Sequence, residues 1–200
     1  FNTAAVKSGN NLQCTTPPAS NIPPITSGDH VTVVLSVRSS ETSVNFVDID
    51  FSFYECDTHK ACVDCVGSRW ACNWCVFDNK CTHDNSTCTV QNEIIITGNN
   101  SRGTAMEGPD ACPQLQPQSG EVLVPNDISR VITVNVANLP AESRTTSFEC
   151  SLNVEGTPQI VPGTRDGSTV TCNVKSYRYT AIEQDLDVAL TLQWEDVDSN

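Results

Sequence analysis

The chain has 200 residues and a formal net charge of -13 at pH 7, because 24 Asp and Glu outnumber 11 Lys and Arg. Without a cluster of basic residues, this balance excludes nucleic acid and anionic membrane surfaces as partners, since both bind clustered Lys and Arg. No apolar run approaches the roughly 20 residues of a membrane-spanning helix. The length suffices for one large or two small domains.

The first 54 residues predict strands. The opening FNTAAVKSGN lacks the basic start and apolar centre of a signal peptide, so we expect either a cytosolic chain or the mature part of an exported one. Apolar residues then occupy every second position from Val31 to Val37 and again from Val47 to Phe53. Such alternation is typical of strands with one buried face.

Eight of the eleven cysteines follow, between residues 56 and 112. The stretch CVDCVGSRWACNWC holds two Cys-x-x-Cys pairs only six residues apart. Zinc modules usually separate such pairs by roughly 12 to 20 residues, and the three histidines (His30, His59 and His83) are scattered. A redox site needs a helix opening at its Cys-x-x-Cys pair, whereas polar turn residues follow Cys75. Both alternatives fit less well than disulfides.

An even number of cysteines in a turn-rich segment with few apolar side chains predicts a disulfide knot, since such a segment cannot fold by hydrophobic burial alone. Each bridge contributes roughly 2–4 kcal/mol. Two glycosylation sequons, Asn85-Ser86-Thr87 and Asn99-Asn100-Ser101, agree with an exported protein. The cysteines and sequons together predict an oxidising, extracellular setting.

Alternation returns after the knot, in four segments that span 132–136, 148–154, 170–174 and 188–194. The loops between them carry Gly, Pro, Asn and Asp, and the chain has no long amphipathic helical pattern. The fold class is therefore expected to be mainly β, with antiparallel sandwiches flanking the knot.

The two flanks resemble each other, which predicts a duplicated module. GNNLQC ends at Cys14, 17 residues before the strand at Val31, and GSTVTC ends at Cys172, 16 residues before Val188. In the second copy Cys172 has an inward-facing partner, Cys150. Cys14 remains, either as a free thiol, in an intermolecular bridge, or, as we favour, paired with a residue before the chain start. The second copy is expected to stop at LQWEDVDSN, where its last strand should begin.

The knot, FYECDTHKACVDCVGSRWACNWCVFDNKCTHDNSTC closing at Cys112-Pro113, resembles the PSI (plexin–semaphorin–integrin) module. Its Cys-Asn-Trp-Cys and Cys-Thr-His elements are particularly similar to plexins. The flanks resemble IPT (TIG) modules, which are immunoglobulin-like β-sandwiches. PSI modules also occur in semaphorins, integrins and the hepatocyte growth factor receptor, but those lack an IPT–PSI–IPT order. The chain therefore resembles the second PSI and second IPT of a plexin ectodomain.

The resemblance implies a first IPT sandwich ending in 1–54, a PSI module in 55–113 and a second, truncated IPT sandwich in 114–200. Residues 89–111 would be a long excursion in which TVQNEIII gives one strand. Trp74 would pack against the bridges as the core of the knot. The implied pairing is Cys56–Cys72, Cys62–Cys112, Cys65–Cys81 and Cys75–Cys88.

No serine or cysteine stands in a recognisable catalytic arrangement with a histidine and an acidic residue, and the glycines form no phosphate-binding motif. We therefore expect that the chain is not an enzyme and binds no cofactor or metal. Asp196 and Asp198 lack the loop of a calcium site and read as a solvated strand end. The favoured hypothesis is a rigid spacer in the extracellular part of a single-pass receptor, whose partners are its neighbouring modules. The resemblance implies that the parent binds semaphorin through its sema domain, in axon guidance, outside this chain.

Two other function classes remain open. A recognition module would contact a ligand, a co-receptor or another receptor copy, and SYRYT offers the candidate patch Tyr177, Arg178 and Tyr179, since interfaces favour Tyr and Arg anchors. The competing interpretation is that these tyrosines pack back on the sandwich. A metal-dependent or redox enzyme would need several free thiols, whereas the disulfide hypothesis predicts at most one.

Overall fold

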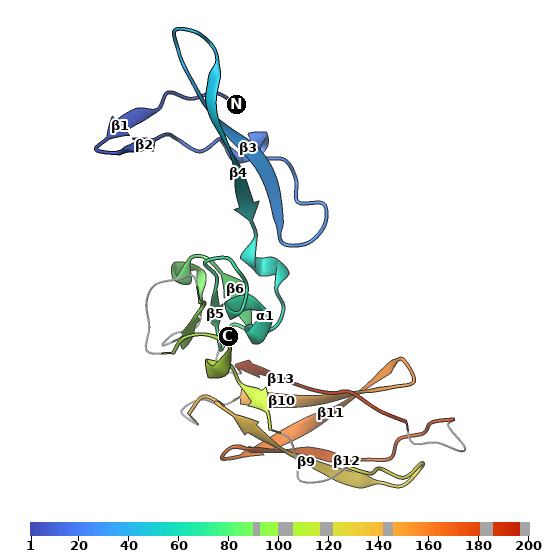
Figure 1. The fold of residues 1–200 in the computed structure, drawn as a ribbon. Coiled ribbons are helices and arrows are strands. Elements are labelled where there is room, and N and C mark those ends of the chain that lie inside the picture. Colours follow the sequence, from blue (N-terminus) through green and yellow to red (C-terminus); the bar gives the residue numbers. More distant parts are fainter. Residues whose placement is uncertain (90–92, 100–105, 117–121, 142–145, 181–185, 197–200) are drawn as a thin grey trace. The chain divides into compact units, whose positions relative to one another are not determined.

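The computed structural model describes residues 1–89, 93–99, 106–116, 122–141, 146–180 and 186–196. Strands dominate these residues and the helical segments are short, which confirms the predicted mainly-β fold class (Figure 1). The chain forms two compact units, Phe1–Thr58 and His59–Asn200. The second unit contains most of the knot together with the following sandwich.

The first unit consists of two hairpins. Its strands are β1 (Val6–Ser8), β2 (Asn11–Gln13), β3 (His30–Arg38) and β4 (Asn45–Tyr54), with short 3-10 turns η1 (Ala19–Asn21) and η2 (Cys56–Thr58). β3 and β4 pair antiparallel, with Val33 opposite Phe51 and Leu35 opposite Ile49. This register places the alternating apolar residues of both strands on one face, as the sequence predicts. Ile49 and Phe51 nevertheless remain 59% and 40% exposed.

The knot in the second unit is built around a small sheet. Strand β5 (Asn73–Cys75) lies between β6 (Lys80–Thr82) and β7 (Ile95–Thr97). The remaining elements are the helix α1 (Cys62–Val66) and the 3-10 turns η3 (Asn85–Thr87) and η4 (Pro109–Ala111). β7 falls inside the excursion for which the sequence predicts one strand. The segments 90–92 and 100–105 of that excursion lie outside the described residues.

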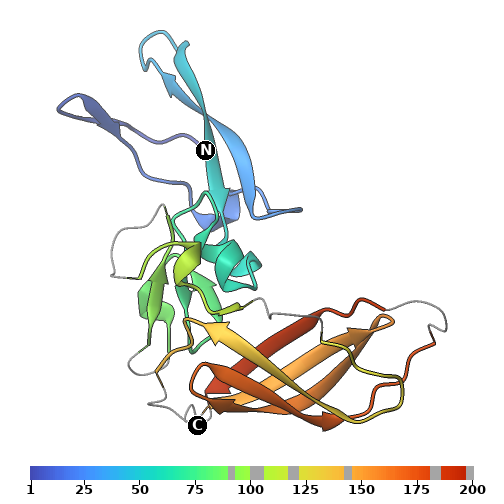
Figure 2. The same cartoon turned by 60° about the horizontal axis from the view of Figure 1, so that its bottom comes forward.

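The sandwich that follows is one antiparallel sheet of six strands, ordered β13-β10-β11-β12-β9-β8, and the sheet curls around its core (Figure 2). Its strands are β8 (Gln114–Leu115), β9 (Arg130–Ala137), β10 (Thr146–Val154), β11 (Thr157–Asp166), β12 (Thr169–Lys175) and β13 (Leu190–Asp196).

Gly163 is the residue at which β11 changes partner, from β10 to β12. It pairs with Phe148 in β10 on one side and with Cys172 in β12 on the other. A Cβ atom at this position would lie 3.1 to 3.3 Å from Val170, Phe148 and Cys150. Glycine therefore lets three strands approach closely at the bend, a role typical of glycine inside strands.

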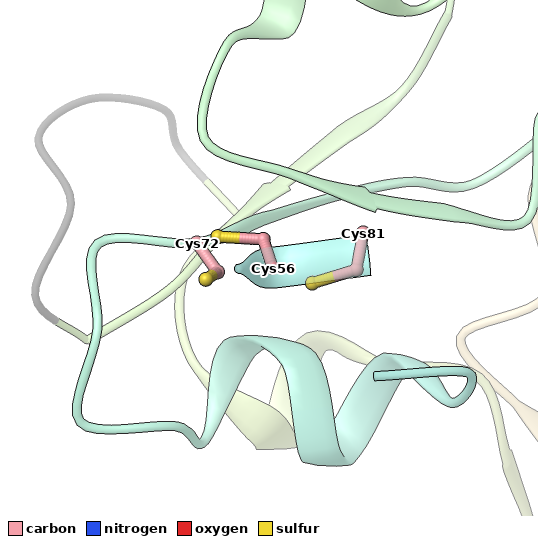
Figure 3. Close-up of side chains that lie close together, drawn as sticks. All are labelled: Cys56, Cys72 and Cys81. Atoms are coloured by element: carbon pink, nitrogen blue, oxygen red, sulfur yellow. The ribbon is translucent and has the colours of Figure 1, made fainter. Parts of the chain in front are cut away.

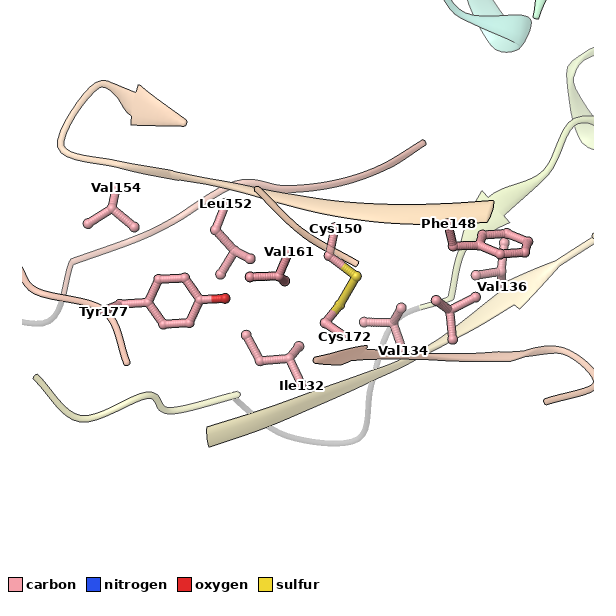
Figure 4. Packing of buried hydrophobic residues seen from close by; sticks show 11 residues of the cluster. Ile132, Val134, Val136, Phe148, Cys150, Leu152, Val154, Val161, Cys172 and Tyr177 are labelled. Atoms are coloured by element: carbon pink, nitrogen blue, oxygen red, sulfur yellow. A yellow bond between two sulfur atoms is a disulfide. The ribbon is translucent and has the colours of Figure 1, made fainter. Parts of the chain in front are cut away.

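The sandwich core contains the predicted inward-facing residues of β9 and β10. Figure 4 shows these side chains pointing toward one another, with the Cys150–Cys172 disulfide between the layers. The buried members from these two strands are Ile132, Val134, Val136, Phe148, Cys150, Leu152 and Val154.

One predicted inward position is wrong. Val174 is 62% exposed, although it continues the alternation of Val170 and Cys172. The pairing of β12 with β9 changes register between Cys172 and Lys175. A bulge of this kind turns the next side chain to the opposite face, so the period-two pattern ends at Cys172.

Candidate functional site: the disulfide knot and its junction with the sandwich

The structure places ten of the eleven cysteines in disulfides and leaves Cys14 as an exposed free thiol. Cys56 and Cys72 are both disulfide-bonded. The remaining bridges are Cys62–Cys112, Cys65–Cys81, Cys75–Cys88 and Cys150–Cys172, the same pairs that the family resemblance and the duplicated pattern imply. Cys14 follows β2 directly, and a partner preceding the chain stays a prediction.

These bridges decide what the cysteine cluster can do chemically. Figure 3 draws Cys56, Cys72 and Cys81, and each of the three is disulfide-bonded. Since a thiolate is the form of cysteine that binds a metal, none of them offers a ligand. Among the described residues, neither grouping of potential metal ligands includes a histidine. The cluster is therefore a set of covalent cross-links.

Trp74 lies at the centre of the knot, as the resemblance implies. It is the middle residue of β5, where it stands opposite Cys81 in β6 and Ile96 in β7, and it is 4% exposed. Ile96 is fully buried beside it. The knot core thus combines one aromatic side chain, a few aliphatic ones and the bridges that enclose them.

Glu93 fixes the turn between β5 and β6, a role that sequence analysis missed. Its half-buried carboxylate accepts hydrogen bonds from the main-chain N–H groups of Phe77 at 2.7 Å, Asp78 at 3.1 Å and Ile94 at 3.0 Å. Burial raises the pKa of this carboxyl above its ordinary value, while the three donors act in the opposite direction. The sequence feature that could have indicated this role is an acidic residue directly before three isoleucines, in the segment EIII.

The connection between the knot and the sandwich is very short. Cys112 is bridged to Cys62 in α1, and β8 begins after a single intervening residue, Pro113. β8 pairs with β9, with Gln114 opposite Ala137. The chain leaving the knot therefore joins the sandwich sheet at once, without a linker.

Two asparagine side chains bond across this junction. Asn138, just after β9, donates hydrogen bonds to the main-chain carbonyls of Asp110 at 2.7 Å and Cys112 at 3.1 Å. Asn79, in the turn between β5 and β6, donates to the carbonyl of Trp194 in β13 at 2.8 Å. Asn138 and Asn79 have φ values of +58° and +48°, in the left-handed region that Asn tolerates better than most residues.

Apolar packing supports the same junction. Phe77 from the knot is 6% exposed and lines a small pocket together with Leu139, Phe148 and Trp194 of the sandwich. The rings of Phe148 and Trp194 lie 6.2 Å apart between centroids. Beside this contact, a cleft of about 390 Å³ separates the knot from β10 and β13. The junction thus consists of a covalent anchor, hydrogen bonds and a packed contact.

The predicted contact patch is not an exposed aromatic surface. Tyr177 is 5% exposed and belongs to the sandwich core, and burial raises the pKa of its hydroxyl. The main chain of Tyr179 exchanges hydrogen bonds with the side chain of Asn126. Only Arg178 faces solvent, paired with Asp127 at 3.0 Å. The tyrosines pack back on the sandwich.

The remaining predicted residues lie at the surface or beyond the described residues. Asn85 and Asn99 are both exposed, whereas Ser101 of the second sequon lies outside the described residues, as does Asp198. Asp196 ends β13. Within the described part of the chain, no helix has the length and apolar character needed to cross a membrane.

Comparison with known proteins gives three family matches. Residues 1–54 match a plexin TIG domain, residues 62–88 match "Plexin A/B, PSI domain", and residues 120–199 match "TIG domain found in plexin". These matches follow the same order as the sandwich, knot and sandwich of the sequence.

Individual relatives agree with the family matches. Plexin-A4 of Homo sapiens is 37% identical over 93% of this chain, and Plexin-A2 of Homo sapiens is 35% identical over 94%. The chain spans about a tenth of the length of these curated relatives. A solved structure of the Plexin A4 full extracellular region, domains 1 to 8, matches 96% of this chain and 20% of its own length, at 35% identity with a TM-score of 0.70.

Proposed function

Since this chain belongs to the plexin family, we propose that it is a rigid spacer in the extracellular part of a semaphorin receptor. In this role the disulfide knot and the following sandwich act as one stiff joint that sets the direction of the ectodomain. The proposed role is mechanical and needs no catalytic group or cofactor. The partners of the segment are the neighbouring modules of the same receptor.

The observation that carries this proposal is the single residue between the knot and the sheet. One residue spans at most about 3.3–3.6 Å, and proline restricts it further by fixing φ. Cys62 anchors the near side of Pro113 through Cys112, while β8 anchors the far side through β9. Modules joined by flexible linkers move independently, but this connection leaves no free chain.

The junction contacts support stiffness beyond the short connection. Asn138 bonds from the end of β9 to the knot, Asn79 bonds from the knot to β13, and Phe77 lines a small pocket with Trp194. Rotation of the knot about Pro113 would break both sets of hydrogen bonds and expose the Phe77 side chain. A recognition role has less support, since the buried Tyr177 removes the proposed aromatic anchor.

The test is to insert Gly-Ser-Gly-Ser between Pro113 and Gln114 in the full-length receptor. We expect the receptor to reach the cell surface and bind semaphorin with unchanged Kd, while ligand-dependent signalling falls, because a flexible linker uncouples the two modules. The matched control places the same insertion after Glu41, in the exposed loop between β3 and β4. Full signalling with the Pro113 insertion would refute the spacer role.

A further inference from the structure

We propose that Asn85 carries an N-linked oligosaccharide, attached to a side chain that the knot itself holds in place. The acceptor sequence Asn85-Ser86-Thr87 forms the exposed turn η3. Asp84 caps this turn and accepts hydrogen bonds from the main-chain N–H of Ser86 at 3.0 Å and from its hydroxyl at 2.7 Å. The inference is independent of the spacer role.

The side chain of Asn85 is oriented by Asn73, which is 6% exposed in β5. The Asn73 amide nitrogen Nδ2 donates to the Asn85 oxygen Oδ1 at 2.9 Å. The oxygen of Asn73 in turn accepts from the main-chain N–H of Gly98 at 3.3 Å. Because the oxygen and nitrogen of a carboxamide point in different directions from their shared carbon, this bond keeps Oδ1 of Asn85 toward Asn73 and leaves Nδ2 directed elsewhere.

Attachment of a sugar is compatible with this arrangement. In the transfer, Nδ2 of Asn85 forms a bond to the anomeric carbon of the sugar, and the bond from that carbon to the diphosphate of a lipid-linked oligosaccharide donor breaks. The diphosphate leaves with the electron pair and the amide nitrogen loses one proton. The amide oxygen remains an acceptor, so the hydrogen bond from Asn73 persists in the modified protein.

The folded turn also indicates when the sugar is attached. The acceptor motif requires the hydroxyl of its third residue. In η3 the Thr87 hydroxyl is engaged with the carbonyl of Asp84 at 2.7 Å and with the Thr82 hydroxyl at 3.0 Å. Transfer therefore takes place on the chain before this turn closes.

A sugar on Asn85 would not disturb the junction between the knot and the sandwich. The knot contacts described above come from Phe77, Asn79, Asp110 and Cys112, and none of them lies in η3. An oligosaccharide on Asn85 therefore leaves these contacts intact and keeps the η3 surface in solvent.

The experiment uses the chain secreted from a eukaryotic cell line, with intact mass measured before and after treatment with peptide-N-glycosidase. Asn85→Asp keeps the oxygen that Asn73 contacts but removes the acceptor nitrogen. We expect it to lose the mass of one oligosaccharide, while Thr87→Ser, which preserves the motif, keeps it. Asn99→Asp reports on the other sequon separately. Equal masses for Asn85→Asp and the parent chain would overturn the proposal.

A second measurement requires no variant. Release of the sugar in heavy-oxygen water converts a modified asparagine into labelled aspartate, so the peptide containing residue 85 should carry the label. An unlabelled, unmodified Asn85 in the secreted chain would refute the proposal even if Asn85→Asp failed to fold.

Discussion

The side chain of Asn138, one residue beyond a sandwich strand, donates a hydrogen bond to the main-chain carbonyl of Cys112, the last cysteine of the knot. A second bond from the same amide reaches the carbonyl of Asp110. One polar residue thus fastens the sandwich to the segment that the Cys62–Cys112 bridge holds in the knot. Asn138 thus makes two hydrogen bonds across the junction, whereas Asn79 makes one.

Replacement of Asn138 tests these two bonds. Asn138→Gly keeps the left-handed backbone and loses two hydrogen bonds, which should lower the free energy of unfolding by about 1–3 kcal/mol. Asn138→Ala should lose about 1–2 kcal/mol more, because Cβ disfavours a positive φ. Guanidinium unfolding of the chain measures both. Unfolding curves that match the parent for both variants would show that these bonds add nothing.

The Cys150–Cys172 bridge is expected to stabilise the sandwich, since it closes a loop of 22 residues between two buried positions. Replacing both cysteines with alanine should lower the free energy of unfolding by about 3 kcal/mol. Trp194 packs against the same core and provides the fluorescence signal. Cys14→Ser is the matched control, because that thiol is exposed and free. A double variant as stable as the control would contradict the prediction.

Gly98 is expected to tolerate no side chain. A Cβ atom there would overlap the main-chain carbonyl oxygen of Cys72, the group to which the Gly98 N–H donates. Gly98→Ala must push this segment away from β5, at a cost of about 1–3 kcal/mol or more. Gly156→Ala, where φ is +80° and the space is open, shows for comparison the cost of backbone strain without a clash, a strain that Gly98 does not carry. Both variants are measured by thermal unfolding, and a parent-like Tm for Gly98→Ala would exclude the contact explanation.

Glu93 should make stability depend on pH in a particular direction. Its pKa is raised in the folded protein, so the fold favours the protonated carboxyl, and stability rises as the pH falls through the folded pKa toward the ordinary value. The stability of the parent relative to Glu93→Gln should therefore increase from about pH 7 to about pH 4.

Glu155 gives the opposite case. Hydrogen bonds from Thr180 lower the pKa of its carboxyl, so its contribution is present above the ordinary pKa and is lost as the pH falls through the folded value. The stability of the parent chain relative to the Glu155→Gln variant should therefore decrease as the pH falls. Denaturant unfolding at several pH values measures both trends, and trends of the same sign would contradict the assignment for Glu93 or Glu155.

The strands were predictable from sequence because side-chain burial repeats with period two along them. The rule placed the apolar faces of β9 and β10 correctly and failed at Val174, where the register changes within β12. The bulge leaves no trace in the alternation of residue types, so a sequence pattern extends straight through it.

The junction was not predictable in the same way. Asn79, Glu93 and Asn138 each act through a single hydrogen-bonded side chain in a loop, and a single polar residue has no periodicity to recognise. Tyr177 shows the reverse problem, since an aromatic residue beside arginine suggests a surface anchor until the fold places it in the core. Cysteine spacing alone leaves many disulfide pairings possible, and the choice among them came from family resemblance.

The most direct test of the rigid joint is a set of amide residual dipolar couplings from weakly aligned protein. Couplings from β5 and β6 in the knot and from β9 to β12 in the sandwich report the orientation of each part. A fixed joint predicts that one alignment tensor fits both groups of couplings. Two tensors of different magnitude would mean that the knot and the sandwich reorient independently, and would contradict the spacer account.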